Sequence, residues 1–566
     1  MQERDARLEK FKKLRDNLPY RFEKTHSIRE LRLSCEKEFE PFEVCVSGRL
    51  KRLSKQDGTT IARLESQREI VVYFDPSQEP KESQEVSLSG RLERKEGKIC
   101  LIGAKISTCE PKPLEEVLKE LEMDPEGLFA RVSARLMNIR KMGKAVFGDI
   151  QDLSGKIQIY LSKDTLGEDG LNRFLELVDV GDVLGIEGEL FRTKAGELTI
   201  DVKRFEILAK SLNPMPEKWH GLKDTEVRYR KRYLDLIVNE EARNVVLIKS
   251  KVLKSIREFL DSNGFIEVET PILQPVASGA SARPFKTFHN ALEEELYLRI
   301  APELYLKKLI IGGLERVYEL GRNFRNEGVD STHNPEFSML EFYAALWDYK
   351  DMMNFVKELI LYVCEKATGE RVIRGKDREI SLDRFNVRSY FELLEEKTGK
   401  DMEFFLKDTS ELREFCKKSG IHNAWELTHG KLIDKVFSTF VEDNLIEPTF
   451  VVDFPRLISP LARSHREDKR LVERFELYIL GKEVANAYSE LTDPVEQKER
   501  FEEQSRDRSL GDEEAMLMDE AFLEALEYGL MPTAGAGIGI DRLVMILTGQ
   551  ESIREVILFP ALKKSS

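Results

Sequence analysis

A short stretch of this 566-residue chain gathers side chains that could bind a nucleotide. Residues 324–343 read FRNEGVDSTHNPEFSMLEFY and lie between two segments of strand-like composition. The glycine, aspartate and Asn-Pro in this stretch are typical of a long hairpin loop. An arginine at its start can bind a phosphate, an aromatic ring can stack on a base, and carboxylates on the returning strand can bind a cationic group. The alternative is a solvated hairpin with scattered charges.

A second group of candidate residues follows late in the chain. Residues 535–542 read GAGIGIDR, a glycine-rich segment that runs into an apolar helix and can bring backbone N–H groups close to a phosphate. It is neither the dinucleotide fingerprint nor a phosphate loop ending in Gly-Lys-Ser/Thr. Its Arg542 and the earlier Arg325 would suit opposite ends of a triphosphate. Glu476 and Glu483 could share magnesium ions held mainly by phosphate oxygens, or they could be surface salt-bridge acids.

The composition is that of an ordinary globular protein of several domains, with 41% hydrophobic and 34% charged residues. The net charge of -14 argues against indiscriminate nucleic-acid binding, so any RNA contact would use a local patch. The six cysteines show no CxxC spacing, and we expect a reduced protein without structural zinc. Because we see no signal peptide and no apolar run near the roughly 20 residues of a membrane helix, we expect a cytoplasmic protein.

The N-terminal half is predicted to hold an arm and two small β-barrels. Residues 1–42 contain a basic helical pattern, which is either a solvated helix or an arm that touches RNA. Residues 43–110 and 129–210 each alternate apolar and polar positions between turns, and a helical connector is expected over 111–128. VSGRL at 46–50 and VSARL at 132–136 align with an offset of 86, which indicates a tandem repeat of one barrel.

The second barrel is the better candidate for reading RNA. It carries Arg140, Phe147 and Gln158 on consecutive predicted strands, and an aromatic face with polar neighbours can stack on unpaired bases. In the first barrel, the position that matches Phe147 is the aliphatic Ile61. The alternative for Phe147 is a core aromatic.

The remaining chain reads as a charged linker over 211–239 and one large domain over 240–566. An amphipathic helix opens this domain and is expected to end before Gly264. Residues 345–440 are mostly helical in pattern and hold no chemical constellation, so we expect a helical insertion there.

Together these segments resemble a class II aminoacyl-tRNA synthetase. GFIEVETPIL ending at Pro271 is similar to the first motif of that family, FRNEG…HNPEFSMLEFY to the second, and GIGIDR to the third. SGASARPF, YLRIAPELYLKKL, ANAYSELTDP and SIREVILFP resemble the lysyl enzymes of bacterial type. The resemblance covers 129–566 and the arm at 1–42, whereas the first barrel is an OB-like repeat additional to the family pattern.

The resemblance implies an α+β fold, in which an antiparallel sheet with flanking helices is preceded here by two tandem OB-type barrels. It implies that L-lysine is activated with ATP in the presence of Mg2+ and is then transferred to the 3′ end of tRNA(Lys). It also implies a homodimer with the first motif at its interface. A carboxylate is already a nucleophile, so this reaction needs no general base, and alignment and charge neutralisation can supply the catalysis.

The resemblance also assigns roles to individual residues. The catalytic step would use Arg325, Glu327 and Arg542. The ATP site would comprise Arg325, His333, Asn334, Phe337, Met339 and Arg542. The lysine site would comprise Gly279, Glu303, Glu341, Tyr343, Asn486, Tyr488 and Glu490. Glu476 and Glu483 would bind the metal, and Arg140, Phe147 and Gln158 would bind the anticodon.

Three other interpretations stay open at this stage. An aspartyl or asparaginyl synthetase is disfavoured because an acidic substrate would not suit three pocket glutamates. A relative that lysylates another protein is disfavoured by the anticodon-type residues of the second barrel. A catalytically inactive paralogue that binds RNA or serves as a scaffold is disfavoured by the intact arginines and metal-site glutamates.

Overall fold

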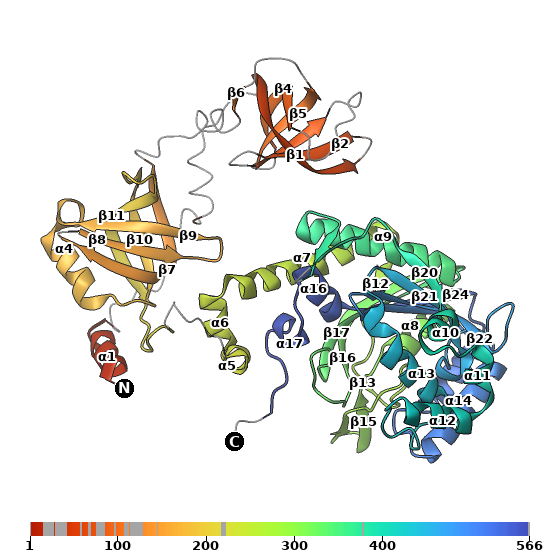
Figure 1. Ribbon diagram of the computed structural model, residues 1–566. Coiled ribbons are helices and arrows are strands. Elements are labelled where there is room, and N and C mark those ends of the chain that lie inside the picture. The colour runs from red at the N-terminus through yellow and green to blue at the C-terminus, as the bar shows by residue number, and fades with distance from the viewer. Residues whose placement is uncertain are drawn as a thin grey trace. The chain divides into compact units, whose positions relative to one another are not determined.

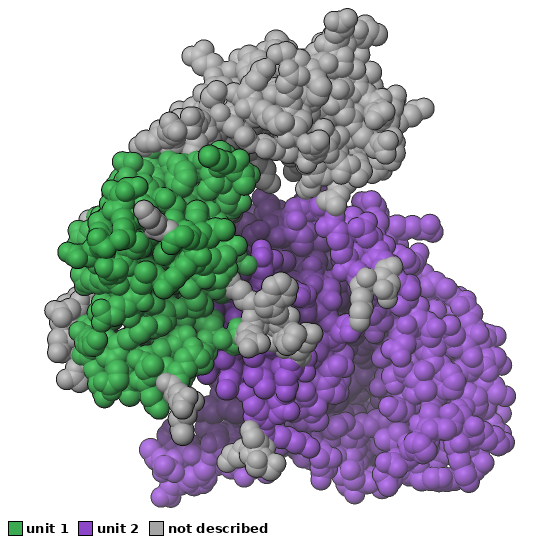
Figure 2. Space-filling view, turned by 60° about the vertical axis from the view of Figure 1, so that its left-hand side comes forward, with its two compact units in different colours: residues 1–217 green, residues 218–566 purple. Residues whose placement is uncertain are grey.

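The chain folds into two compact units, residues 1–217 and 218–566 (Figures 1 and 2). Each unit is described by itself. The computed structural model describes residues 2–14, 28, 42–56, 59–65, 69–74, 85–95, 98–106, 112–113, 128–143, 145–216, 222, 224–375 and 378–563.

In the first unit, residues 129–209 close into a five-stranded barrel. Its strands are β7 (Phe129–Met142), β8 (Ala145–Gln151), β9 (Lys156–Ser162), β10 (Val183–Arg192) and β11 (Leu198–Ala209), with α4 (Lys163–Leu177) after β9. They pair in the closed order β10-β11-β9-β8-β7, and only the β9–β11 contact is parallel. Alternate side chains fill an aliphatic interior, as the period-two pattern predicts.

Residues 42–106 follow the same pairing pattern. β1 (Phe42–Gln56) lies between β2 (Thr59–Glu65) and β4 (Glu85–Lys95), and β3 (Glu69–Phe74) pairs with β2 and, in parallel, with β5 (Lys98–Ile106). VSGRL lies in β1 and VSARL in β7, so the aligned segments occupy corresponding strands.

The connector expected to be helical over 111–128 was predicted wrongly at its start. Within it, β6 (Lys112–Pro113) pairs in parallel with β1 and so continues the first sheet. The prolines at 111 and 113 suit such a short edge strand better than a helix interior. Residues 114–127 lie outside the described part of the chain.

The predicted N-terminal arm contains α1 (Gln2–Leu14), which packs on the second barrel. Arg7 donates to the carbonyl oxygen of Val180 (2.9 Å), and Lys10 pairs with Asp179 (2.8 Å). These two cations therefore serve contacts within the protein, which weakens the interpretation of the helix as an RNA-touching arm. Most of the remaining residues up to 41 lie outside the described part of the chain.

The segment 211–239 is not simply a linker, because its second half is helical and belongs to the second unit. It forms α5 (Thr225–Arg230) and α6 (Arg232–Val238). Arg228 pairs with Glu555 (2.8 Å), and the buried Arg232 donates to the carbonyl oxygen of Leu558 (3.0 Å). Arginines of the expected charged linker thus bind the C-terminal segment.

The core of the second unit is an eight-stranded sheet, and its six central strands are antiparallel, as expected. The two edge strands pair in parallel and so depart from the prediction. In spatial order the strands are β12 (Ile266–Glu267), β16 (Arg316–Phe324), β17 (Glu336–Ala345), β24 (Thr533–Gly539), β23 (Lys482–Ser489), β22 (Leu471–Ile479), β21 (Thr449–Pro455) and β20 (Asn386–Ser389).

One face of this sheet is covered by three helices, α7 (Glu240–Ser262), α9 (Tyr349–Thr368) and α16 (Ile540–Thr548). They share a single hydrophobic core with the even-numbered residues of β17 and β24. As expected, α7 ends before Gly264, whose φ of +78° favours glycine. The opposite face of the sheet is left for polar residues.

The expected helical insertion over 345–440 is only partly separate from this core. Within it, α9 packs on the main sheet and β20 forms its edge, while β18 (Val372–Arg374) and β19 (Glu379–Ser381) make a small ladder. The following helices do form a cluster of their own around Tyr390 and Phe437. These helices are α10 (Tyr390–Thr398), α11 (Met402–Lys407), α12 (Thr409–Lys418) and α13 (His429–Phe440).

The remaining elements frame the polar face of the sheet. A small sheet holds β13 (Leu273–Gln274), β15 (Glu294–Leu298) and β14 (Lys286–His289), and the helices on this side are α8 (Glu303–Ile311), α14 (Pro494–Ser509) and α15 (Glu520–Glu527). The short helix α17 (Ile553–Val556) instead packs with α7 and α16 in the core of the other face. Among the described helices, none combines the length and apolar character needed to span a bilayer.

Candidate active site

Two cavities open on the polar face of the eight-stranded sheet. Their volumes are about 250 and 330 Å³. They meet, because the same five residues line both of them: Arg325, Met339, Glu483, Asn486 and Gly537.

The strand register places the predicted site residues in rows across the floor of these cavities. Side chains alternate along each strand, so residues two apart share this face and their neighbours enter the core. Across β17, β24, β23 and β22, one row holds Glu341, Gly537, Asn486 and Glu476, and the next holds Tyr343, Gly535, Tyr488 and Arg474.

The glycines of β24 provide space in this floor. A Cβ on Gly535 would overlap Glu490 Oε1 and the Tyr343 ring, and one on Gly537 would overlap Met339 Cε. The strand pairs with β17 and β23 on its two sides over these residues. At Gly535 and Gly537 the backbone is therefore used for strand pairing, and the prediction that this segment offers N–H groups to a phosphate does not hold there. These two glycines instead leave space for the side chains of Glu490, Tyr343 and Met339.

Glu483 reaches the cavity face through an irregularity in the sheet. The pairing of β22 with β23 shifts by one residue between Leu477 and Tyr478, beside Glu483. Such a bulge turns a side chain that strict alternation would place on the other face. This feature brings Glu483 toward Glu476, and both line the larger cavity.

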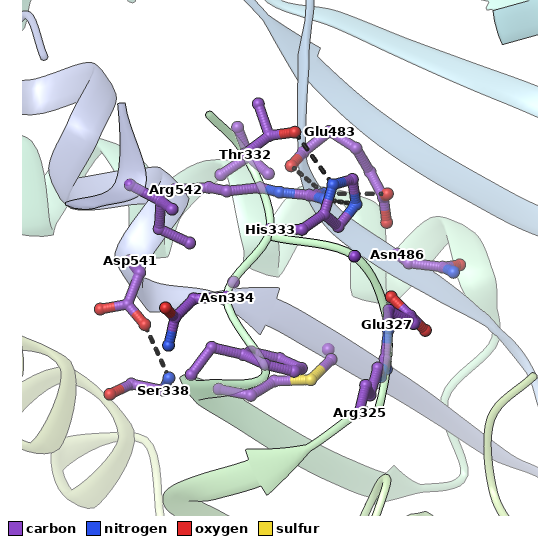
Figure 3. A pocket seen from close by; sticks show the side chains of 17 residues that line it. Arg325, Glu327, Thr332, His333, Asn334, Ser338, Glu483, Asn486, Asp541 and Arg542 are labelled. Atoms are coloured by element: carbon purple, nitrogen blue, oxygen red, sulfur yellow. Dashed lines mark hydrogen bonds and ion pairs between the residues drawn. The ribbon is translucent and has the colours of Figure 1, made fainter. Parts of the chain in front are cut away.

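The smaller cavity is bounded by the predicted hairpin, whose loop joins β16 to β17 (Figure 3). His333 Nδ1 lies 2.9 Å from Asp330 Oδ2, and its Nε2 lies 3.3 Å from the Arg542 guanidinium. Since arginine can only donate, Nε2 is the acceptor of this contact. Arg542 also pairs with Glu483 of β23 (3.2 Å). Through Arg542, α16 therefore contacts both the loop and β23.

Arg325 lies where the two cavities join, half-buried, with its guanidinium 5.1 Å from the centre of the Phe337 ring. Burial lowers its pKa from the ordinary value, while Glu327 and Glu483 act in the opposite direction. Its Nε has no hydrogen-bond partner among the described residues. A cationic donor with unused capacity at this junction suits an anionic reacting group.

Two further side chains hold the smaller cavity in shape. Asn334, predicted as an ATP ligand, lines the cavity, but its amide donates to the Glu336 carbonyl (2.6 Å) and accepts from the Ala561 N–H (3.1 Å). Asp541, which was not among the predicted residues, accepts from the Ser338 N–H (2.7 Å) and from Lys249 Nζ (2.5 Å). Its place at the start of an apolar helix in GIGIDR was the available clue.

The three acids predicted for the lysine site come from different elements and lie at the larger cavity. Glu303 and Glu341 line it, and Glu490 lies behind Gly535; all three are buried. Burial raises the pKa of Glu341 to about 8, and Glu303 adds to the shift. Burial also raises the pKa of Glu490, although Lys307 opposes this shift. The predicted carboxylates are thus brought together in a poorly solvated site.

The other predicted residues of this cavity surround the acids. Tyr343 donates to Glu341 Oε2 (3.2 Å), and Tyr488 donates to Glu303 Oε1 (2.7 Å). Gly279 has a φ of +91°, and a Cβ there would lie 3.3 Å from the Cβ of Glu303, so a larger residue would be strained. Tyr343 and Tyr488 thus orient the carboxylates of Glu341 and Glu303, respectively.

Lys307 is a site residue that the sequence did not single out. Its fully buried Nζ lies 2.6 Å from Glu303 Oε1 and forms an ion pair with Glu490. The spacing of Glu303 and Lys307 by four positions in a helical segment was the available clue.

The predicted metal residues offer an incomplete ligand set. Glu476 binds Arg474 through one oxygen and accepts from the Tyr478 hydroxyl (2.6 Å) through the other. Within the described residues, no group of three or more His, Cys, Asp or Glu side chains is arranged to hold a metal. Glu476 and Glu483 therefore fit a magnesium ion only if phosphate oxygens supply most of its ligands.

The second barrel carries the predicted anticodon residues on its outer face. Phe147 pairs in register with Arg140 on β7 and with Tyr160 on β9, and its ring centre is 5.1 Å from that of Tyr160. Phe147 is partly exposed and does not belong to the barrel core, so the core alternative is wrong. Gln158 accepts from Thr199 Oγ1 (3.1 Å).

Comparison with known proteins agrees with both units. Residues 224–563 match the family described as tRNA synthetases class II (D, K and N), and residues 130–208 match the OB-fold nucleic acid binding domain. A lysine–tRNA ligase of Aquifex aeolicus is 53% identical over 99% of this chain and 95% of its own length. A lysine–tRNA ligase of Carboxydothermus hydrogenoformans is 52% identical over 76% of this chain and 88% of its own length. Lysine–tRNA ligase 2 of Methanosarcina acetivorans is 48% identical over 87% of this chain and 98% of its own length.

Proposed function

This chain belongs to the tRNA synthetases of class II (D, K and N), and we propose that its two joined cavities hold ATP and L-lysine. The enzyme activates L-lysine with ATP to lysyl-adenylate and pyrophosphate and transfers the lysine to the 3′ end of tRNA(Lys). The observation that carries the choice of lysine is the larger cavity, which Glu303 and Glu341 line and which Glu490 adjoins at Gly535; these buried acids suit a substrate with two ammonium groups.

The smaller cavity is the proposed ATP site. Phe337 would stack on adenine, with Met339 lining the base pocket, and His333 and Arg542 would bind the distal phosphates. Support comes from their shared lining of one cavity and from the Arg542–His333 contact. Asn334 would act by holding the loop rather than by donating to ATP, because its amide already bonds within the chain.

The larger cavity is the proposed lysine site. Glu303 and Gly279 would hold the α-ammonium, and Asn486 would help hold the carboxylate. Glu341, Tyr343 and Glu490 would surround the ε-ammonium, with Tyr488 beside the aliphatic stem. Support comes from the burial of the acids, since a buried carboxylate gains most from a cationic partner.

The chemical step would take place where the cavities meet. An oxygen of the lysine carboxylate attacks the α-phosphorus, the new P–O bond forms, and the bond to the bridging oxygen breaks as pyrophosphate leaves with its electron pair. Arg325 would align the two anionic groups and stabilise the charge on the phosphorus, with Glu327 beside it at the cavity wall. No general base is needed, because the carboxylate is already a nucleophile.

Magnesium is the proposed companion of ATP. Glu476 and Glu483 would hold it together with phosphate oxygens, and the bound ion would neutralise phosphate charge. Both acids line the larger cavity, and Glu483 also lines the smaller one, next to Arg542.

The second barrel is proposed to bind the anticodon. Phe147 would stack on the middle base, U35, and Arg140 and Gln158 would contact its neighbours. The partly exposed aromatic pair Phe147 and Tyr160 supports this assignment.

Residues 43–110 are proposed to be a second OB-type barrel with an auxiliary or structural role. The support is that β1–β5 pair in the same order as β7–β11, including a parallel contact of the third strand with the fifth. The match to the Aquifex aeolicus ligase covers 99% of this chain and so includes this segment.

A homodimer in the cytoplasm, where tRNA is charged for translation, completes the proposal. The segment that resembles the first family motif exposes Ile266, Ile272 and Leu273, which an interface would cover. Sedimentation at several protein concentrations tests this: a mass of one chain throughout would contradict the dimer.

The decisive experiment is ATP–pyrophosphate exchange with lysine, aspartate and asparagine in turn, without tRNA and with magnesium. We expect exchange with lysine alone. Exchange with aspartate or asparagine would mean that the acids of the larger cavity have been misassigned. No exchange with any of the three would favour an inactive RNA-binding protein.

A further inference from the structure

Lys307 lies buried behind the larger cavity, in contact with two of the three acids of the proposed lysine site. It lies on α8 one turn after Glu303, and its side chain has no exposed surface. Its Nζ contacts Glu303 Oε1 and Glu490 Oε2, and the rings of Tyr488 and Phe522 lie 5.6 and 5.8 Å from it. Lys307 is not among the described residues that line either cavity, and its Nζ is already in contact with two carboxylates, so it is placed to act on the acids rather than on a ligand.

The contacts of Lys307 use one oxygen of each carboxylate. Glu490 Oε1 has no hydrogen-bond partner among the described residues, and it lies against Gly535, which lines the cavity. Glu303 accepts from both Lys307 and the Tyr488 hydroxyl through Oε1. The second oxygen of each acid is thus left for a ligand, and the carboxylates are fixed from behind.

The charges of the proposed lysine site also favour a partner such as Lys307. Ionised Glu303, Glu341 and Glu490, the three acids of that site, would carry one negative charge more than the two ammonium groups of a diamino acid can neutralise. An excess buried charge is costly, and one of the acids would keep a proton instead. One buried ammonium from the protein removes that excess when the substrate is bound.

We propose that Lys307 is a positioning residue for lysine binding, which orients Glu303 and Glu490 and neutralises the negative charge that the two substrate ammonium groups leave on the three acids of the proposed lysine site. This inference rests on the proposed assignment of the larger cavity to lysine. Without Lys307, Glu490 would be an unpaired buried acid, would retain its proton and would lose its attraction for the substrate ammonium.

The test compares Lys307→Met and Lys307→Arg in the full chain by lysine-dependent ATP–pyrophosphate exchange. We expect Lys307→Met to raise the KM for lysine at least about tenfold, the change for one lost hydrogen bond to a charged group, with little change in the KM for ATP. Lys307→Arg keeps the charge and should restore part of the loss. Lys308→Met is the matched control, because Lys308 is the next residue of α8 and lies 3.9 Å from Asp519 instead. An unchanged KM for lysine in Lys307→Met, or equal rises for lysine and ATP, would overturn the proposal.

A second comparison guards against a variant that does not fold. Lys307→Met leaves a buried acid unpaired, whereas Lys307→Met with Glu490→Gln removes both charges of that pair. We expect the double variant to show nearly the KM for lysine of Glu490→Gln alone, since Lys307 acts largely through Glu490. A further tenfold rise would show that Lys307 acts independently of Glu490. If the unmodified enzyme shows no exchange with lysine, the proposed function fails; if it does and Lys307→Met matches it, only this inference fails.

Discussion

At the residue scale, the protonation of Glu341 makes lysine binding depend on pH. Burial raises its pKa to about 8, so the carboxyl of the empty pocket is mostly neutral at pH 7 and ionises as pH rises through that value. An ammonium ligand binds the ionised form, and its binding must therefore expel a proton at neutral pH. We expect the KM for lysine to fall as pH rises from about 6 to about 8.

Exchange rates over that range, with the KM for ATP measured in parallel, check this pH dependence. Glu341→Gln cannot ionise, so it should bind lysine weakly and lose most of the pH dependence of KM. A pH profile in Glu341→Gln that keeps its original slope would assign the proton to another group.

Gly535 controls the shape of the same pocket without offering any polar side chain. A Cβ at this position would overlap Glu490 Oε1 and the Tyr343 ring, and both are parts of the proposed ε-ammonium site. We expect Gly535→Ala to lower kcat/KM for lysine by about 100-fold, the usual effect of misplacing a group by about 1 Å.

The KM for ATP serves as the internal control for Gly535→Ala. This KM should change little, because Gly535 lines the larger cavity and not the smaller one. Normal use of lysine by this variant would mean that Glu490 is not held against Gly535.

At the element scale, α5 and α6 are held to the second unit by a buried charge cluster. Asp235 accepts from Arg228 Nε (2.9 Å) and from Arg232 (2.6 Å), and it is fully buried. Removing this carboxylate leaves two guanidiniums without it, and loss of one partner of a buried ion pair costs about 3–5 kcal/mol. We expect Asp235→Ala to lower the midpoint of thermal unfolding of the second unit clearly.

The matched control is Glu226→Ala on the same pair of helices. Glu226 pairs with Arg230 across one turn and is largely exposed, so its loss should cost no more than about 0.5 kcal/mol. Calorimetry of both variants separates the two cases, and equal midpoints would contradict a stabilising role for the buried cluster.

These helices also show what the sequence could and could not predict. The strands and the hairpin were predictable, because alternation and turn residues are local properties. The role of the arginines of α5 and α6 could not be predicted, because Glu555, the partner of Arg228, follows more than 300 residues later. Likewise β20 was assigned to an insertion, because its pairing with β21 is a long-range contact.

Part of the candidate site was also predictable, because strand alternation is a local property, whereas the burial of its side chains depends on distant parts of the chain. The alternation within β17 and β23 already placed Glu341 with Tyr343, and Asn486 with Tyr488, on common faces. Neighbouring lysines could not be told apart: Lys307 is fully buried between acids, whereas Lys308 is partly exposed. The space left by Gly535 could not be seen either, since it depends on side chains of other strands.

At the scale of the whole molecule, the two units divide the proposed work. Both cavities are lined by residues of the second unit alone, and the proposed anticodon residues belong to the first. Changes in the first unit should therefore alter tRNA use while lysine-dependent exchange without tRNA continues. This separation allows the barrel of residues 129–209 and the proposed barrel of residues 43–110 to be compared in the intact enzyme.

Substitutions of Phe147 and Ile61 allow a matched comparison of the two segments, because these residues occupy aligned positions. Each lies on the second strand of its barrel, where Phe147 pairs with Tyr160 and Ile61 with Tyr73. Loss of one stacked base costs about 1–3 kcal/mol, so Phe147→Ala should raise the KM for tRNA(Lys) about tenfold or more. Ile61→Ala removes no aromatic ring and should leave that KM unchanged, as should deletion of residues 46–128. If Ile61→Ala or the deletion raised the KM for tRNA as much as Phe147→Ala, the first barrel would also bind RNA, and its auxiliary role would have to be abandoned.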